Sequence, residues 1–304
     1  MQPIVIVGCQ RSGSTMLGSM LGAHSEMAAI PEAQFFVDCM PSIKEPFNVS
    51  KIVEQIKQHY RFKIWNYSFP PVSENFSTYQ EVFESLVKDY ALKIHDKKGL
   101  KYWVDHQPGH VKHIAKIKNY YRGLKVINII RDGRAVANSI MPLDWGPNAI
   151  HKAAYFWEQR IGYGFAVQRF LGEEQCLTVH YEHLVENPNS SMKTICDFLG
   201  LEFEDAMLET SGLKVPKFTT SQHNLVGQGL VNTRSDGWKT ELSQREIEIF
   251  EKLTGDMLTY LGYSPITTQQ TTFKLRERLL LEVSHLIKVL ANKYAFRRRV
   301  KRFS

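Results

Sequence analysis

Residues 7–17 have the sequence VGCQRSGSTML and follow directly on the apolar residues 3–6. A short apolar run that ends at a glycine is typical of a buried parallel strand. We predict a strand over residues 4–7 and, after it, a helix over residues 14–23. Residues 8–13 then form a polar, glycine-containing turn between the strand and the helix.

The spacing of this turn is close to that of a Walker A loop. Gly8 and Gly13 are followed by Ser14 and Thr15, whereas the Walker pattern G-x-x-x-x-G-K-[ST] has a lysine where this chain has Ser14. Such a loop aims backbone N–H groups at an anion, and the start of the following helix adds a positive dipole end. Further donors come from Arg11, Ser12 and Thr15. The loop therefore suits a phosphate or a sulfate, and a turn without a ligand remains the alternative.

A second strand and turn of the same kind follow later in the chain. Residues 124–130, LKVINII, predict a strand, and residues 131–139, RDGRAVANS, open a helix over residues 132–140. Arg131 lies at the tip of this strand, and Ser139 lies two turns down the helix. Two such loops at the carboxyl ends of one sheet favour a ligand with two separated anionic groups. The structural alternative is that Arg131 and Asp132 pair with each other and cap the helix.

The rest of the chain alternates between strand and helix patterns. Further strands are predicted over residues 102–104 and 176–179, and helices over residues 79–95, 108–121, 149–171, 190–199 and 243–261. This alternation predicts an α/β fold with a parallel sheet and helices on both faces. We place one domain over residues 1–264, and a linker with a basic amphipathic helix over residues 265–304.

Composition excludes several classes of protein. The net charge is +7, but residues 273–304 hold ten Lys and Arg against two Glu, which leaves about −1 for the other 272 residues. A nucleic-acid groove across the body is therefore not expected. We expect no membrane span and no secretion signal, because no apolar run is long enough. The four cysteines lack metal-ligand spacing, so we predict reduced thiols, no metal site and a cytoplasmic location.

The C-terminal segment is amphipathic. Apolar residues recur at intervals of three to four, at positions 275, 279, 283, 286, 287 and 290, and a cluster of Arg and Lys follows at 297–302. Such a helix can lie on an anionic membrane surface, which would make the protein peripheral to a membrane. It can equally dock on the body or on a second subunit.

Residues 11–15 (RSGST) and 131–139 together resemble two motifs of the sulfotransferase family that uses 3′-phosphoadenosine 5′-phosphosulfate (PAPS). In that family a loop of the type RSGTT holds the 5′-phosphosulfate, and a segment RDGRA…S holds the 3′-phosphate. The resemblance implies the sulfotransferase fold and a cofactor that needs no metal. It assigns the 5′ end of PAPS to Arg11, Ser12, Gly13, Ser14 and Thr15, and the 3′-phosphate to Arg131 and Ser139.

Two later segments extend the resemblance to residues 3–262. Residues 180–188, HYEHLVENP, are similar to a family segment YE-x-L…P and imply that Tyr181 lies near the nucleotide. Residues 235–243, SDGWKTELS, are similar to a late loop whose basic residue closes over the cofactor. The resemblance accordingly assigns Lys239 and Ser221 to the cofactor as well.

The closest branch of the family acts on tyrosyl and carbohydrate groups, and there a glutamate after the first helix is the catalytic base. Glu32 stands at the matching spacing, 21 residues after Arg11. Sulfuryl transfer needs a base for the acceptor hydroxyl and cations for the developing charge, roles that we assign to Glu32 and Arg11. A helix-entry carboxylate is the alternative for Glu32.

The chain departs from that branch at residues 105–108, DHQP, where the branch has a lysine before the proline. His106 can donate to the sulfuryl oxygens or serve as the base, as a histidine does in cytosolic sulfotransferases, so the base is either Glu32 or His106. A hydrogen-bonded structural histidine is the alternative.

Three functions follow from these patterns. The first is a PAPS-dependent sulfotransferase that acts on a hydroxyl acceptor, which is a carbohydrate, a tyrosyl group or a small molecule. The others are a P-loop-type kinase, which Ser14 disfavours, and a non-catalytic nucleotide-binding module. Aromatic residues of the segment 36–100 are expected in the acceptor pocket or in the core, namely Phe62, Trp65, Tyr67, Phe69 and Phe76.

Overall fold

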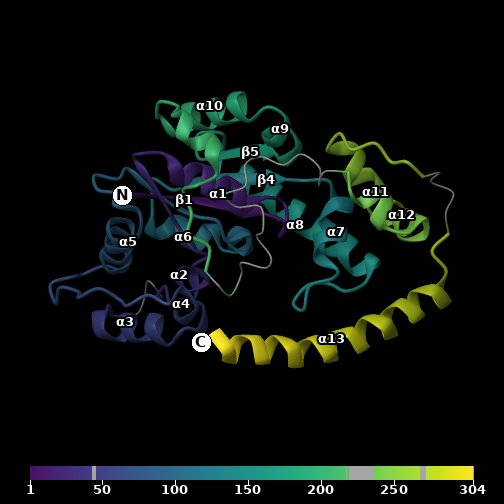
Figure 1. The fold of residues 1–304 in the computed structure, drawn as a ribbon, viewed down its shortest axis with the longest axis horizontal. Coiled ribbons are helices and arrows are strands. Elements are labelled where there is room, and N and C mark those ends of the chain that lie inside the picture. Colours follow the sequence, from purple (N-terminus) through teal and green to yellow (C-terminus); the bar gives the residue numbers. More distant parts are fainter. Residues whose placement is uncertain (43–45, 217, 219–235, 268–271, 304) are drawn as a thin grey trace.

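A five-stranded parallel sheet forms the centre of the molecule (Figure 1). The structure is a computed structural model that describes residues 1–42, 46–216, 218, 236–267 and 272–303. The strand order is β2-β3-β1-β4-β5. The strands are β1 (Gln2–Gly8), β2 (Met27–Ile30), β3 (Tyr102–Asp105), β4 (Lys125–Ile130) and β5 (Cys176–His180).

Helices connect the strands and cover the sheet. The α-helices are α1 (Ser14–Ala23), α2 (Gln34–Asp38), α3 (Val49–Gln58), α4 (Tyr60–Trp65), α5 (Tyr79–His95), α6 (Ile114–Tyr120), α7 (Gly133–Ile140), α8 (Ile150–Leu171), α9 (Tyr181–Glu186), α10 (Pro188–Leu199), α11 (Trp238–Glu241), α12 (Gln244–Tyr260) and α13 (Leu275–Phe303). Two short 3₁₀ helices are η1 (Pro108–Lys112) and η2 (Asp205–Glu209).

The sheet is buried on both faces, which explains why its strands are continuous apolar runs. Alternate residues of β1 enter different cores: Ile4 and Ile6 pack with α1, α9 and α10, whereas Val5 and Val7 pack with α2, α3, α5 and α6. This period of two is what a pleated strand dictates. The predicted α/β fold with helices on both faces is confirmed.

A third core cluster stabilises the end of the molecule that α7, α8, α11 and α12 form, at the right of Figure 1. Trp157 is fully buried at its centre, and its ring contacts Phe250 of α12 at 5.9 Å between centroids. This cluster ties residues after 236 to the helix that follows β4. Residues far apart in the sequence therefore support the second predicted anion loop.

Two local differences from the sequence prediction have physical causes. The predicted helix over residues 108–121 is divided into η1 and α6 at His113, whose backbone (φ −124°, ψ 9°) is not helical. Strand β2 was not predicted, because MAAI is only four residues long and is buried throughout, so it shows no alternation. The predicted helix after residue 243 begins with a capping box, since the side chains of Ser243 and Glu246 each accept a hydrogen bond from the other residue's backbone N–H.

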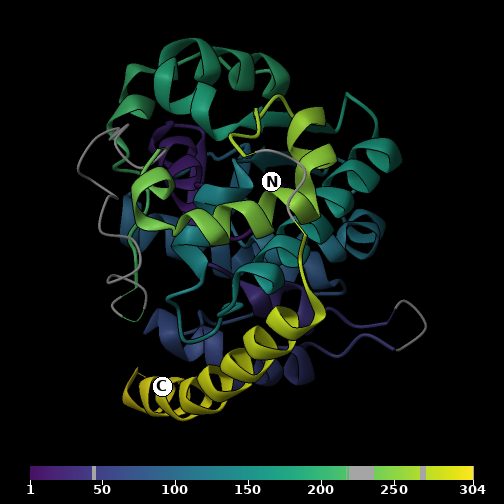
Figure 2. The same cartoon turned by 90° about the vertical axis from the view of Figure 1, so that its right-hand side faces the viewer.

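Helix α13 runs along one side of the molecule, as Figures 1 and 2 both show. Its last turns approach α3 and α4 at the other end of the body (Figure 1). Among the described residues, no helix is long and apolar enough to cross a membrane. The division of the chain at residues 264 and 265 stays a prediction. Ser264 nevertheless contacts the body, because its carbonyl oxygen accepts a hydrogen bond from Arg134 at 3.0 Å.

Candidate active site

All five strands end at the same edge of the sheet, and each is followed by a predicted site residue. Because the strands are parallel, their carboxyl ends are neighbours. The register sets Ile30 of β2 beside Asp105 of β3, and Gly8 of β1 beside Ile129 of β4. Along this edge the strands β2, β3, β1, β4 and β5 are followed by Glu32, His106, the loop 9–13, Arg131 and Tyr181, respectively.

The loop after β1 can adopt its shape only with glycine at two positions. Gly8 has φ 137°, and a Cβ there would lie 2.3 Å from the carbonyl oxygen of Ile129. Gly13 has φ 97°, and a Cβ there would lie 2.5 Å from Cδ2 of Tyr181. These positions require glycine both for backbone conformation and for space. The ring of Tyr181 thus packs directly on the loop.

The start of α1 supplies donors that fit an anion. Gly13 is the N-cap residue, no side chain caps the helix, and its first turn contains no acidic residue. Ser12 is fully buried, and its Oγ has no hydrogen-bond partner among the described residues. Since buried polar groups are normally paired, this hydroxyl together with the uncapped N–H groups fits a phosphate or sulfate oxygen. Ser14 and Thr15 stand in the first turn of the same helix.

Contacts between side chains join the two predicted anion loops. The Nε of Arg11 donates to Oγ of Ser139 at 3.0 Å, and a terminal nitrogen of Arg131 donates to the carbonyl oxygen of Arg11 at 2.9 Å. The Arg131 guanidinium also lies over the ring of Tyr181, 4.3 Å from its centroid. Arg11 adopts φ 72°, a conformation that is unusual for a residue with a side chain. The structure therefore brings Arg11, Arg131, Ser139 and Tyr181 together.

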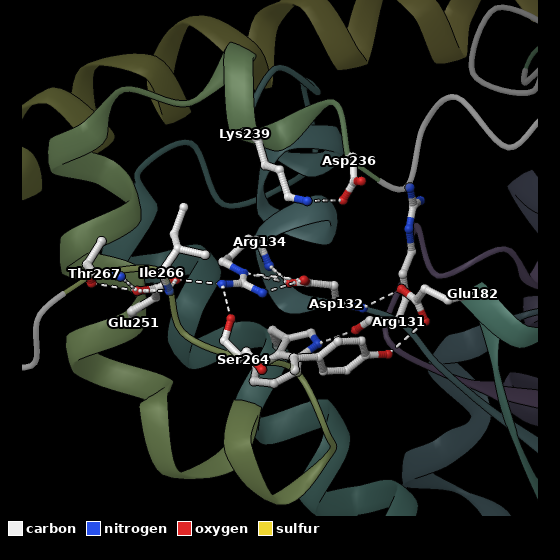
Figure 3. Close-up of polar contacts among 12 residues, drawn as sticks. Arg131, Asp132, Arg134, Glu182, Asp236, Lys239, Glu251, Ser264, Ile266 and Thr267 are labelled. Carbon is white, nitrogen blue, oxygen red and sulfur yellow. Dashed lines mark hydrogen bonds and ion pairs between the residues drawn. The ribbon is translucent and has the colours of Figure 1, made fainter.

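The motif RDGRA contains two arginines with different environments (Figure 3). Arg134 is buried, and its guanidinium contacts the carboxylates of Asp132 at 2.7 Å and Glu251 at 2.5 Å. Glu251 in turn accepts hydrogen bonds from the backbone N–H groups of Ile266 and Thr267. Asp132 thus pairs with Arg134, whereas the guanidinium of Arg131 points away from that pair (Figure 3). Of the structural alternative, the capping part is correct, because Oδ1 of Asp132 accepts from the N–H of Arg134 at 2.8 Å and caps α7. The ion pair of Asp132, however, is formed with Arg134.

The backbone of the Arg131 loop is held on both sides (Figure 3). The carbonyl oxygen of Arg131 accepts a hydrogen bond from Nε1 of Trp157 at 3.1 Å. On the other side, the N–H of Asp132 donates to Oε1 of Glu182 at 3.0 Å. The hydroxyl of Tyr263 donates to the other oxygen of Glu182 at 2.8 Å. The segment YE after β5 therefore contributes a ring to the glycine loop and a carboxylate to the arginine loop.

The remaining predicted cofactor residues are Lys239 and Ser221. Lys239 is in α11, is about half exposed, and pairs with Asp236 at 2.8 Å (Figure 3). Helix α11 lies against α7, since Nδ2 of Asn138 donates to Glu241 at 2.7 Å. Helix α11, which carries Lys239, therefore lies beside the helix that the second anion loop opens. Ser221 lies outside the described residues.

A cleft adjoins the other end of this arrangement. Its space measures about 330 Å³, which includes open solvent at the mouth, and it is lined by Thr15, Pro31, Glu32, Arg61, Ile64, Trp65, His106, Leu213, Val215 and Pro216. Thr15 belongs both to this wall and to the start of α1. The cleft is therefore continuous with the glycine loop, and it brings the two candidate bases, Glu32 and His106, into one space.

Glu32 is oriented by a neighbouring cation. Its carboxylate lies 3.3 Å from a terminal nitrogen of Arg61, and its side chain is 21% exposed. Burial works to lower the pKa of Arg61, but Glu32 and Tyr60 outweigh it, so this pKa is raised. The Nε1 of Trp65 donates to the backbone oxygen of Glu32 at 3.3 Å. A carboxylate with a fixed position and access to the cleft has the properties that a general base needs.

His106 is buried beside Glu32. It is 3% exposed and packs against α1, where a Cβ on Gly18 would lie 2.9 Å from that of His106. Neither of its ring nitrogens has a hydrogen-bond partner among the described residues. Burial lowers the pKa of His106, although the carboxylates of Glu32 and Asp105 act in the opposite direction. The imidazole is therefore neutral at pH 7 and can still donate one N–H.

Asp105 links the positions of the two candidate bases. It is fully buried at the end of β3, and its Oδ1 accepts from the N–H of Gln107 at 3.0 Å and of Ala33 at 3.4 Å. These residues directly follow His106 and Glu32. The other oxygen, Oδ2, lies 2.9 Å from Nε2 of His110. Asp105 was not among the predicted site residues, although a carboxylate at the end of a buried strand is a signal that the sequence contains.

The aromatic residues expected in the acceptor pocket or in the core belong to a hydrophobic core or pack against it. Phe62 is 4% exposed, and its ring contacts Phe35 at 5.4 Å and Phe69 at 5.7 Å between centroids. The hydroxyl of Tyr67 donates to Asp89 at 2.5 Å. Among the five, only Trp65 lines the described cleft. Arg61, which does line it, was not predicted, because its local sequence carries no signal for a role beside Glu32.

The family model described as "Sulfotransferase family" matches residues 3–205. This match covers more than half of the chain and contains both anion loops. The chain belongs to the sulfotransferase family. The family resemblance predicted from the sequence is confirmed.

Two sequence relatives of this sulfotransferase-family chain are named as tyrosine sulfotransferases. It is 25% identical over 213 residues to Protein-tyrosine sulfotransferase A of Caenorhabditis elegans, which covers 67% of this chain and 51% of that protein. It is 24% identical over 279 residues to Protein-tyrosine sulfotransferase 1 of Danio rerio, which covers 86% of this chain and 72% of that protein. The chain thus spans about half the length of the Caenorhabditis relative.

Solved structures bear on the fold alone. The sulfotransferase domain from the curacin biosynthetic pathway superposes with a TM-score of 0.56 at 19% identity, covering 86% of this chain and 97% of that domain. The sulfotransferase domain from the Synechococcus PCC 7002 olefin synthase gives a TM-score of 0.54 at 22% identity, with 83% and 94% covered. The predicted sulfotransferase fold is confirmed by these matches.

Among the described residues, no group of three or more His, Cys, Asp and Glu is placed to hold a metal ion. Cys9 lies in the glycine loop but is fully buried, and burial raises its pKa to about 12. It is therefore a protonated packing residue and not a nucleophile. Among the described residues, the functional groups at the carboxyl edge of the sheet are hydroxyl, amide and guanidinium donors on one side, and Glu32 and His106 on the other.

Proposed function

We propose that this chain is a PAPS-dependent sulfotransferase that acts on a hydroxyl acceptor. The observation that carries the proposal is the order of residues along the carboxyl edge of the sheet. The donors of β1, β4 and β5 gather at one end, Glu32 and His106 at the other, and Thr15 belongs to both. The proposed nucleotide site and the proposed acceptor site are therefore adjacent and meet at Thr15.

The donor set fits the two charged ends of PAPS. The uncapped start of α1 with Ser12, Ser14 and Thr15 would hold the 5′-phosphosulfate. Arg131 and Ser139 would hold the 3′-phosphate, with Tyr181 beside the nucleotide and Lys239 closing over it. The assignment of Ser221 to the cofactor stays a prediction. PAPS supplies the sulfuryl group. Transfer of this group to the acceptor oxygen leaves 3′-phosphoadenosine 5′-phosphate as the second product. Ser14 in place of the Walker lysine agrees with a cofactor that has no triphosphate.

Glu32 is the proposed general base. Its carboxylate would take the proton from the acceptor hydroxyl, and the Arg61 contact holds it in position. His106 is the proposed donor to a sulfuryl oxygen, since a neutral imidazole still carries one N–H and both of its nitrogens lack a described partner. Arg11 would stabilise the charge that develops on the transferred group. In the alternative assignment, His106 accepts the proton.

The proposed acceptor is a hydroxyl on an apolar or aromatic group. The cleft walls beside Glu32 are mostly apolar, with Ile64, Trp65, Leu213, Val215 and Pro216. Tyrosyl peptides are the first candidates, because the relatives carry that substrate in their names. Carbohydrates and small molecules complete the set to be screened with labelled PAPS. A cytoplasmic location stays a prediction.

Binding measurements test the proposal directly. Calorimetry should show that 3′-phosphoadenosine 5′-phosphate binds in the presence of EDTA, and that ATP with Mg²⁺ binds much more weakly. Arg122→Ala removes an exposed arginine at the opposite end of β4 from Arg131. It serves as the control for Arg131→Ala in these binding measurements. Preferential binding of ATP with Mg²⁺ would support the kinase alternative instead.

A further inference from the structure

Helix α13 presents an apolar face to solvent. Its exposed large apolar residues are Leu275, Leu279, Leu280, Val283, Leu286, Ile287, Leu290 and Tyr294, each between 56% and 72% exposed. At 3.6 residues per turn these eight positions fall within an arc of about 140°. We call this set the apolar arc. Soluble proteins rarely expose an apolar patch of this extent unless it binds something.

The opposite face of α13 holds the helix to the body through polar contacts. Glu277 pairs with Arg245 at 2.6 Å, Glu282 with Lys152 at 2.6 Å, and Arg299 with Asp144 at 2.9 Å. Additional hydrogen bonds join His285 and Asn292 to Asn148. These contacts span most of the helix length, so its orientation is fixed with the apolar arc outward.

The charged residues of α13 are also divided between the side that faces the body and the side that faces solvent. Its two acidic residues, Glu277 and Glu282, are both turned toward the body and paired there. Basic residues remain exposed along the helix, at Arg276, Arg278, Lys293, Arg297 and Arg298. At 100° per residue, Arg297 and Arg298 continue the side of the apolar arc beyond Tyr294. The outward face is therefore apolar along its length and basic at its end.

We propose that the apolar arc of α13 binds an anionic lipid membrane, with the helix lying in the plane of the interface. Apolar side chains with basic neighbours are the combination that inserts between lipid headgroups and attracts anionic lipids. A second copy of the chain is a poorer occupant, because two such faces would bring exposed arginines and lysines of like charge together. The polar contacts to the body explain how the helix keeps this face outward before it meets a membrane.

A site-specific fluorescent probe tests the orientation. The four native cysteines are all buried, so one added cysteine on the full chain can be labelled selectively. Leu286→Cys places an environment-sensitive dye on the apolar arc, and Ser284→Cys places it on an exposed flank of the same helix. Vesicles of phosphatidylcholine with phosphatidylserine should shift only the Leu286→Cys emission to shorter wavelength. Vesicles of phosphatidylcholine alone should give a much smaller shift.

Sedimentation with the same vesicles tests the energetics. The combined variant Leu279→Gln, Leu286→Gln, Leu290→Gln should bind at least about tenfold more weakly, because it removes exposed apolar side chains. Arg297→Gln with Arg298→Gln should also weaken binding by about tenfold or more at low salt. Phe170→Gln with Tyr260→Gln, which are exposed apolar residues outside α13, should leave binding unchanged.

Three results would overturn the proposal. They are absence of binding to anionic vesicles, equal shifts from the two probe positions, and a self-association that the apolar-arc variant removes without any vesicle binding. The last result would assign the apolar arc to a second copy of the chain.

Discussion

The two ends of the site are built differently. At the nucleotide end, Arg11, Ser139, Arg131, Tyr181 and Gly13 contact one another within and between short loops. At the acceptor end, the cleft is assembled from segments around residues 31, 61–65, 106 and 213–216, which are distant in the sequence. A compact motif therefore defines the first end, and tertiary packing defines the second.

The difference extends to how each end is held in place. Backbone hydrogen bonds from Trp157 and Glu182, together with the buried Arg134 network, fix the arginine loop. The acceptor end depends on the Asp105 carboxylate, which holds the residues after Glu32 and His106. We infer that substitutions at the nucleotide end will separate cleanly into binding and stability effects, and that those at the acceptor end will change turnover.

The largest effect is expected at the acceptor end. Glu32→Gln keeps the shape of the side chain but cannot accept a proton, so kcat should fall by roughly 10²–10⁴ while nucleotide binding stays near normal. Rapid-mix kinetics with labelled PAPS, alongside calorimetry, give both quantities. Glu26→Gln, a surface carboxylate before β2 that pairs with Lys101, should keep full activity.

The companion variant decides between the two bases. His106→Ala should reduce kcat by roughly 10²–10³ if the imidazole is a donor to the sulfuryl group. Near-normal turnover of Glu32→Gln, combined with complete loss in His106→Ala, would reverse our assignment. The pH profile of turnover separates the two bases poorly. Burial lowers the pKa of His106, so a histidine limb would shift toward the range of a carboxylate.

Arg134 contrasts with Arg131 in the same motif. Arg134→Ala would leave the carboxylates of Asp132 and Glu251 buried without their partner, so the free energy of unfolding should fall by about 3–5 kcal/mol. Denaturant titration measures this loss. Unchanged stability would show that the network in Figure 3 does not hold the loop.

Arg131→Ala should act on binding instead. It should weaken 3′-phosphoadenosine 5′-phosphate by about 1.5–3 kcal/mol, because a charge-assisted contact to the 3′-phosphate is lost. Adenosine 5′-phosphosulfate lacks that phosphate and should bind almost as before. An equal loss for both ligands in calorimetry would rule out the 3′-phosphate role.

The smallest effect concerns pH. The pKa of His106 is lowered by burial, so the unfolded chain binds a proton more readily than the folded one. As pH falls below about 6.5, the usual value for histidine, wild-type stability should decrease relative to His106→Gln by up to about 1.4 kcal/mol per pH unit. At higher pH the difference should be constant. Unfolding titrations at several pH values measure it, and a flat difference throughout would contradict a buried neutral imidazole.

The sequence predicted the nucleotide end because its chemistry is local. Positions 8 and 13 require glycine because their φ angles are positive and because a Cβ would not fit. A polar turn at the end of an apolar strand can be recognised without tertiary information. The family match and the fold confirm the family resemblance that these loops indicated, while the roles of the loops and of their residues stay predictions.

The acceptor end could not be predicted to the same degree. Strand β2, which positions Glu32, is too short and too uniformly buried to show a period. Arg61 reaches Glu32 only through tertiary packing. Four of the five aromatic residues expected near the acceptor serve other contacts, since hydrophobicity alone does not distinguish a core from a pocket wall.

The most direct test follows sulfur-labelled PAPS in a single turnover with a tyrosyl peptide, a carbohydrate or a small phenol, in EDTA. Our account predicts that the label moves to a hydroxyl of at least one acceptor without added metal, and that Glu32→Gln slows the transfer by roughly 10²–10⁴ while the nucleotide still binds. Tight binding of 3′-phosphoadenosine 5′-phosphate with no transfer to any acceptor, or transfer from ATP that requires Mg²⁺, would contradict it.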